Sequence, residues 1–121
     1  MDKQKIALAS SDGIVVNKHF GRASSFYIYD IEEGKEPNYI ETRLVTPICE
    51  TGEHDENKLE ENLLSLKDCS NIIAVRIGPG ARAKAEQMGI NCFEIPGLIP
   101  QAIDKLQNYI KLQELLERKL Q

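Results

Sequence analysis

Residues 72–82 read Ile-Ile-Ala-Val-Arg-Ile-Gly-Pro-Gly-Ala-Arg, and this stretch decides the fold class. Its continuous apolar start is typical of a central strand that is covered on both faces of a sheet. Glycine and proline at 78–80 end the strand, and strong helix formers at 81–88 predict a helix with Gly89 as its C-terminal cap. Residues 91–95 return as a strand. The two strands are therefore expected to be parallel.

The residues before this unit predict more strands and one helix. Residues 5–9 indicate a short buried strand, and 14–16 form a brief β-branched run. Side chains alternate over 26–31 and again over 39–45 around a polar turn, which predicts an antiparallel hairpin. Leucines at helical spacing predict a helix over 55–67. The order of elements predicts an α/β fold, a mixed five-stranded sheet with helices packed on it, compatible with an RNase H-like domain.

The C-terminal region predicts one long amphipathic helix. Pro100 suits its first turn, and apolar residues share a stripe from Ile99 to Leu120. The part over 111–121 is expected to protrude from the domain. Two interpretations stay open for it: a frayed tail, or a contact that forms a homodimer, because the apolar stripe continues there.

Length and composition favour one intracellular domain. The 121 residues and 13.6 kDa fit a single domain over 1–121. No apolar run reaches the roughly 18 residues of a membrane helix, and we expect neither a membrane association nor a signal peptide. Three widely spaced cysteines do not suggest a secreted disulfide framework. Reduced thiols in the cytoplasm are the expectation.

The charge balance argues against a nucleic-acid partner. The chain has 15 basic and 19 acidic residues, a net charge of −4, whereas phosphate neutralisation requires a basic surface. An RNase H-like nuclease would also need acidic residues that converge on two metal ions. Asp12, Asp30 and Asp68 lie near predicted strand ends, but in positions common for structural carboxylates. Nuclease activity is therefore disfavoured.

The loop at 17–22 combines residues that could bind a metal-containing anion. His19 supplies an imidazole, Lys18 and Arg22 supply positive charge, and Gly21 allows the backbone to approach a ligand. Taken alone, a loop histidine is more often a surface or hydrogen-bonded residue. The interpretation of His19 as a ligand depends on the rest of the chain.

Two cysteines could join His19. Cys49 lies in an irregular segment that reaches His54, and Cys69 immediately precedes the central strand. Thiolate and imidazole are the ligands that iron-sulfur clusters use. The sequence has no CxxC motif, and each cysteine could equally be structural. Cys92 lies inside a predicted strand and is assigned to core packing.

The turn that follows the central strand could bind an anion. Gly78 and Gly80 lie between a strand end and a helix N-terminus, where free N–H groups and the helix dipole favour negative charge. Arg76 and Arg82 flank these glycines. Neither a Walker nor a dinucleotide-binding fingerprint is present. The alternative is an ordinary Gly-Pro-Gly turn that starts a helix.

Several blocks of the sequence occur in an order that marks a known family. They include His19-Phe20-Gly21 and Asp68-Cys69, together with residues 6–13, 16–18, 26–29, 76–82 and 89–90. Over about residues 5–106 the chain resembles the dinitrogenase iron-molybdenum cofactor biosynthesis family, which comprises NifX-type proteins and the C-terminal domain of NifB-type proteins. No single block is as specific as their order and spacing.

The resemblance implies an RNase H-like fold and a carrier role. A carrier of this kind holds an iron-sulfur or iron-molybdenum cofactor precursor during transfer between nitrogenase cofactor assembly proteins, without catalytic turnover, so we expect no enzyme. The radical-enzyme domain of NifB-type relatives has no counterpart here, which implies no cluster synthesis. The ligand candidates are His19, Cys49 and Cys69. The competing class is a regulatory or interaction module of the same fold that binds a small anion or a partner protein.

Overall fold

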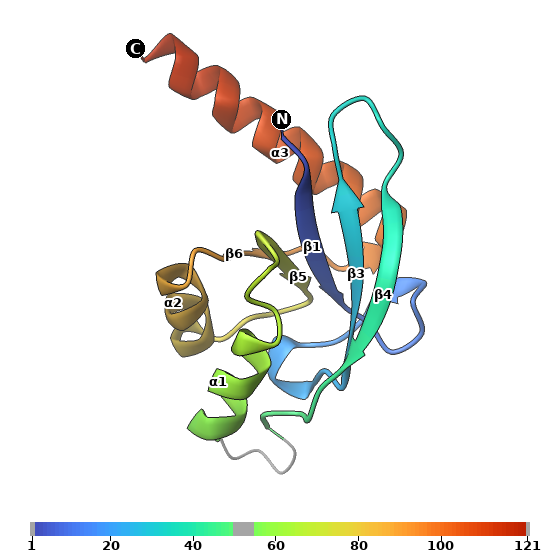
Figure 1. Ribbon diagram of the computed structural model, residues 1–121, viewed down its shortest axis with the longest axis vertical. Coiled ribbons are helices and arrows are strands. Elements are labelled where there is room, and N and C mark those ends of the chain that lie inside the picture. Colours follow the sequence, from blue (N-terminus) through green and yellow to red (C-terminus); the bar gives the residue numbers. More distant parts are fainter. Residues whose placement is uncertain (1, 50–54, 121) are drawn as a thin grey trace.

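A computed structural model describes residues 2–49 and 55–120 and confirms the mixed sheet (Figure 1). Its five strands are β1 (Gln4–Ala9), β3 (Ser25–Ile31), β4 (Asn38–Leu44), β5 (Asn71–Ala74) and β6 (Asn91–Glu94), in the order β4-β3-β1-β5-β6. The pairs β1–β3 and β3–β4 are antiparallel, while β1–β5 and β5–β6 are parallel. The predicted strand-helix-strand unit is therefore confirmed.

Three helices cover the two faces of this sheet. The first two, α1 (Glu56–Leu64) and α2 (Pro79–Gln87), lie on one face, and α3 (Ile99–Lys119) lies on the other (Figure 1). Residues Ile6 and Leu8 of β1 pack against the core under α3, whereas Ala7 and Ala9 face the core under α1 and α2. This alternation follows from the period of two along a strand. It explains why β1 is apolar without interruption from Ile6 to Ala9.

Two features of the fold differ from the sequence expectation. A second small sheet joins β2 (Val15–Val16) to β7 (Gly97–Leu98) in antiparallel pairing. The sequence does not predict β7, because a strand of two residues has no periodicity to detect. In addition, α1 ends at Leu64 and α2 begins at Pro79, since proline fits the first turn of a helix.

The end of α3 extends past the sheet, toward the upper left of Figure 1. The helix is regular to Lys119, and Leu112, Leu115 and Leu116 are 54%, 52% and 47% exposed. A homodimer contact through these leucines stays a prediction. Among residues 2–49 and 55–120, no helix is both long enough and apolar enough to cross a bilayer.

Candidate functional site

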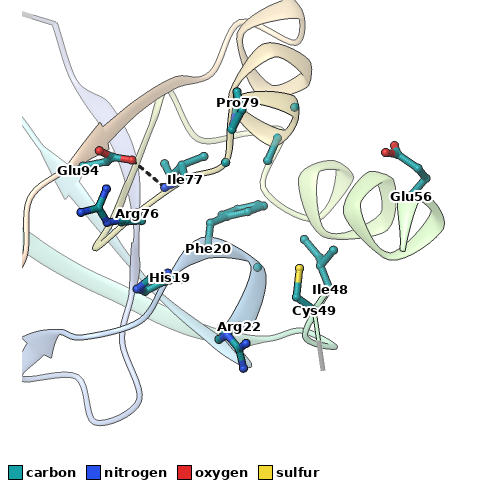
Figure 2. Close-up of a pocket in the computed structure, with 14 residues that line it drawn as sticks. His19, Phe20, Arg22, Ile48, Cys49, Glu56, Arg76, Ile77, Pro79 and Glu94 are labelled. Atoms are coloured by element: carbon teal, nitrogen blue, oxygen red, sulfur yellow. Dashed lines mark hydrogen bonds between the residues drawn. The ribbon is translucent and has the colours of Figure 1, made fainter. Parts of the chain in front are cut away.

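A cavity of about 790 Å³ opens beside the C-terminal end of β5 (Figure 2). Three segments form most of its wall: the short 3-10 helix η1 (Phe20–Arg22) with His19 before it, the pair Ile48 and Cys49, and the turn from β5 into α2. These segments are far apart in the sequence. The predicted histidine loop and the glycine turn thus meet in one pocket.

Main-chain hydrogen bonds hold the three walls together. The N–H of Phe20 donates to the carbonyl of Arg76 at 2.8 Å, and the N–H of Val75 donates to the carbonyl of Lys18 at 3.0 Å. The N–H of Cys49 donates to the carbonyl of Gly21 at 2.8 Å. A Cβ on Gly21 would lie 3.0 Å from the Cys49 sulfur, so glycine permits this close approach. The pocket frame is therefore set by the backbone.

Phe20 anchors the histidine loop to the core. Its side chain is 2% exposed, and its ring centroid lies 5.6 Å from that of Phe26 on β3. The rest of the loop is more open: His19 and Arg22, on either side of Phe20, are exposed. Burial of Phe20 fixes the direction from which both polar side chains reach the pocket.

The N-terminus of α2 supplies unpaired donors to the pocket. Gly78 is the N-cap residue, no side chain caps the helix, and Pro79 opens its first turn. The first N–H groups of a helix have no partner within it and carry partial positive charge. Gly78 and Gly80 leave open space where a Cβ would stand. The glycine turn therefore provides the open helix N-terminus that an anion site requires, while anion binding itself stays a prediction.

Two of the predicted cations line the pocket and two do not. Arg22 and Arg76 belong to its wall, and within the described part of the chain neither forms an ion pair. Arg82 instead donates to the carbonyl of Cys92 at 2.8 Å, with Nη2 3.8 Å from Glu94. Lys18 contributes its carbonyl to the frame, and its side chain is not part of the wall.

Glu94 is a pocket residue that the sequence did not reveal. Its Oε2 accepts the N–H of Ile77 at 2.9 Å, and Figure 2 shows it near Arg76 at the rim. Glu56 also lines the pocket, and Lys84 Nζ lies 2.7 Å from its carboxylate. A single carboxylate at a strand end has no spacing signal. Only the parallel placement of β5 and β6 brings Glu94 beside the turn.

The predicted metal ligands do not all meet. His19 and Cys49 line the same pocket but lie on opposite sides of the Phe20 ring (Figure 2). Cys69 is 3% exposed and does not line the pocket. It precedes β5, whereas the pocket follows β5, so the length of a strand separates them. His54 lies outside the described residues, and among the described ones no three His, Cys, Asp or Glu side chains form a metal-binding group.

The expectation that Cys69 could converge with His19 is therefore not met. Burial raises the pKa of the Cys69 thiol to about 12, and the neighbouring Asp68 carboxylate adds to this shift. Burial likewise raises the pKa of Cys92 to about 11, in line with its predicted core role. Cys49 is half-buried at the pocket. Of the three cysteines, only Cys49 combines access with a place in the site.

Alkylation should separate the three thiols. On treatment of the folded protein with iodoacetamide near pH 8, we expect Cys49 to react first, with Cys69 and Cys92 at least about 100-fold slower, because thiolates react and buried thiols rarely ionise. Peptide mass spectrometry after timed quenching measures this, and the same reaction in denaturant is the control. Equal alkylation rates for Cys49 and Cys69 in the folded protein would contradict the placement of Cys49 at the pocket and Cys69 in the core.

The carboxylates considered for a nuclease are each engaged elsewhere. Asp12 accepts the N–H groups of Ile14 and Val15, and Asp30 pairs with Lys5 at 2.9 Å. Asp68 pairs with both terminal nitrogens of Arg43, at 2.7 and 2.8 Å, and this lowers its pKa to about 2. These roles are structural.

Fold and pocket together define a small α/β domain with an open cavity that carries a thiol, an imidazole and two arginines that form no ion pair with another described residue. The family model for the dinitrogenase iron-molybdenum cofactor matches residues 2–109. The chain therefore belongs to the dinitrogenase iron-molybdenum cofactor family, as the sequence blocks predicted.

Curated relatives agree with this family. The chain is 34% identical over 104 residues to the FeMo cofactor biosynthesis protein NifB of Frankia alni, a match that covers 84% of this chain and 20% of that protein. It is 29% identical over 92 residues to protein NifX of Klebsiella pneumoniae, covering 76% of this chain and 56% of NifX. The chain thus spans a fifth of that NifB and just over half of that NifX.

Solved structures share the architecture. A NifB-like protein from Thermotoga superimposes with a TM-score of 0.59 at 25% identity, covering 87% of this chain and 88% of the other. A dinitrogenase-type protein from Methanocaldococcus jannaschii superimposes with a TM-score of 0.52 at 15% identity, covering 80% and 81%. At that identity the second match supports the fold alone. The α/β arrangement is that of NifB-like and NifX-like domains.

Proposed function

We propose that the chain binds an iron-sulfur or iron-molybdenum cofactor precursor in the pocket and holds it for transfer during nitrogenase cofactor assembly, without catalytic turnover. The observation that carries the proposal is the pocket itself. It joins His19, Cys49, two arginines and the open end of α2 around one cavity. Its volume of about 790 Å³ falls within the range of roughly 300–1,000 Å³ that is usual for ligand sites.

The charges of the pocket suit an anionic metal cluster. Arg22 and Arg76 are not neutralised by ion pairs in the described structure, and the N–H groups at the start of α2 favour negative charge. Two carboxylates oppose this charge, but one oxygen of Glu94 already accepts the Ile77 N–H, and Glu56 pairs with Lys84. The remaining charges at the pocket rim therefore favour an anionic ligand.

The donor set suits a carrier more than a permanent holder. His19 and Cys49 offer one nitrogen and one sulfur from different walls, and both are compatible with iron. A permanent cluster site commonly supplies four thiolates or their equivalent. With few protein ligands, open coordination positions remain through which the next protein can take the cargo.

Anaerobic reconstitution tests the proposal. We expect the wild type, mixed with cluster extracted from nitrogenase, to gain iron and charge-transfer absorption in the visible range. A His19→Ala/Cys49→Ser double variant should retain at most about a tenth of that iron, because both protein ligands are lost. Cys92→Ser is the matched control and should load normally, while Cys69→Ala tests whether the buried thiol takes part. Absence of iron in the wild type, or equal loading by the double variant, would refute the carrier role.

A second candidate is the regulatory or interaction module of the same fold. One observation favours it: His19 and Cys49 lie apart, whereas the arginines and the α2 N-terminus can bind a small anion without any metal. Calorimetric titration with inorganic phosphate distinguishes this candidate from the carrier. Binding of phosphate by a chain that fails to load cluster would favour this candidate. The carrier proposal also includes nitrogenase cofactor assembly proteins as partners and a location in the cytoplasm.

A further inference from the structure

Among the described residues, the strand β4 forms an unpaired edge of the main sheet, at the right of Figure 1. It is seven residues long, and three of its large side chains are exposed: Tyr39 at 50%, Ile40 at 40% and Leu44 at 84%. None of the residues that line the pocket belongs to β4. A long, exposed and partly apolar edge strand can template pairing with another strand.

The hydrogen-bonding direction of each β4 residue follows from its partner β3. The N–H of Val45 donates to the carbonyl of Ser24, so the pair 45–24 is a hydrogen-bonded pair. Because such pairs alternate in antiparallel sheets, Arg43 and Glu41 also direct their main-chain groups toward β3. Thr42 and Leu44 therefore present their N–H and carbonyl groups to the open side.

The charges on β4 select one register for pairing with a second copy. When two identical strands pair antiparallel, a two-fold axis passes beside one residue, and that residue lies opposite itself. An axis at Glu41, Thr42 or Arg43 leaves most of the strand paired. An axis at Glu41 or Arg43 places two like charges opposite each other. An axis at Thr42 places Glu41 opposite Arg43 and Thr42 opposite itself. Ile40 is the extra residue of the β-bulge that shifts the β3–β4 register, and it lies outside these pairs. Opposite-charge and Thr–Thr pairs stabilise a sheet, whereas like charges oppose it.

We propose that β4 pairs antiparallel with β4 of a second copy about a two-fold axis at Thr42, so that two sheets join edge to edge. The Thr42 pair contributes two main-chain hydrogen bonds across the axis. The Glu41–Arg43 pairs fall at non-hydrogen-bonded positions, where side chains approach most closely.

The charged groups are already held in place for this contact. Arg43 donates to both oxygens of Asp68 at 2.7 and 2.8 Å and to the carbonyl of Ser65 at 2.8 Å. Its Nε donates to Glu41 at 2.8 Å. Across the axis, Glu41 and Arg43 of both copies would form four alternating charges. Because the side chains are ordered beforehand, pairing loses little of their conformational entropy.

Complementary charge reversals test the proposal. By analytical ultracentrifugation at protein concentrations up to about 0.5 mM, we expect the wild type to dimerise. Glu41→Lys places a lysine opposite Arg43, and Arg43→Glu places two glutamates opposite each other, so each variant alone should have a dissociation constant raised about tenfold or more. In an equimolar mixture every pair across the axis is complementary again. The mixture should therefore recover the dimer.

Two further variants keep the outcome decisive. Leu116→Glu, on the exposed end of α3, should leave the dimer intact. If Arg43→Glu does not fold by circular dichroism, Thr42→Pro replaces it, since it removes an outward N–H that β3 does not use. A wild type that stays monomeric at the highest concentration overturns the proposal. So does a dimer that only Leu116→Glu disrupts, which would place the interface on α3.

Discussion

Reversal of both pocket arginines, in an Arg22→Glu/Arg76→Glu variant, is expected to weaken binding of an anionic cluster by about 100-fold or more, because each lost charge-assisted contact contributes roughly 1.5–3 kcal/mol. The frame should persist, since the Arg76 carbonyl that accepts the Phe20 N–H is unchanged. Equilibrium titration with extracted cluster under anaerobic conditions measures the effect. The weakening should shrink as salt is added, because solvent-exposed charges are screened.

A matched variant separates local charge from net charge. Lys105→Glu/Arg118→Glu changes the net charge by the same amount but lies on α3, outside the pocket wall. We expect it to bind cluster within a factor of about two of the wild type, since α3 lies on the opposite face of the sheet and exposed charges are screened by salt. If both double variants lose binding equally, the attraction is a property of the whole molecule and the pocket assignment is wrong.

Phe20→Ala should give the largest loss of stability among the site residues. The side chain is 2% exposed and packs against Phe26, so its removal leaves a cavity that costs about 3–5 kcal/mol of unfolding free energy. Urea denaturation followed by circular dichroism measures the change. Phe20→Leu keeps most of the volume and should lose about 1–1.5 kcal/mol. A loss below about 1 kcal/mol in Phe20→Ala would show that the residue is not a core anchor.

Much of the fold could be predicted from local pattern. The apolar run of β5, the Gly-Pro-Gly turn and the helix formers after it determine a parallel unit, because a helix between two strands leaves little other choice. The stripe from Ile99 to Leu106 likewise predicted α3 and its buried face. The pairing of β2 with β7 could not be predicted, since two residues carry no period and the pairing depends on tertiary contact.

The candidate site was predicted in part, for a similar reason. Sequence reasoning placed His19, Cys49 and the Arg76 turn in loops, and the fold brings all three to one cavity. It also grouped Cys69 with them, which was wrong, because Cys69 precedes the same strand that the Arg76 turn follows and the two therefore lie at opposite ends of β5. Glu94 was missed, as its contact with the Ile77 N–H arises only from adjacent parallel strands.

The main-chain frame of the pocket has a consequence for how this domain could diversify. The bonds from Phe20 to Arg76, from Val75 to Lys18 and from Cys49 to Gly21 use only peptide groups, which nearly every residue type supplies. Side chains at positions 19, 22, 49 and 76 can therefore be exchanged while the walls stay in place. A descendant chain could acquire a new guest molecule through a few substitutions and keep the old architecture.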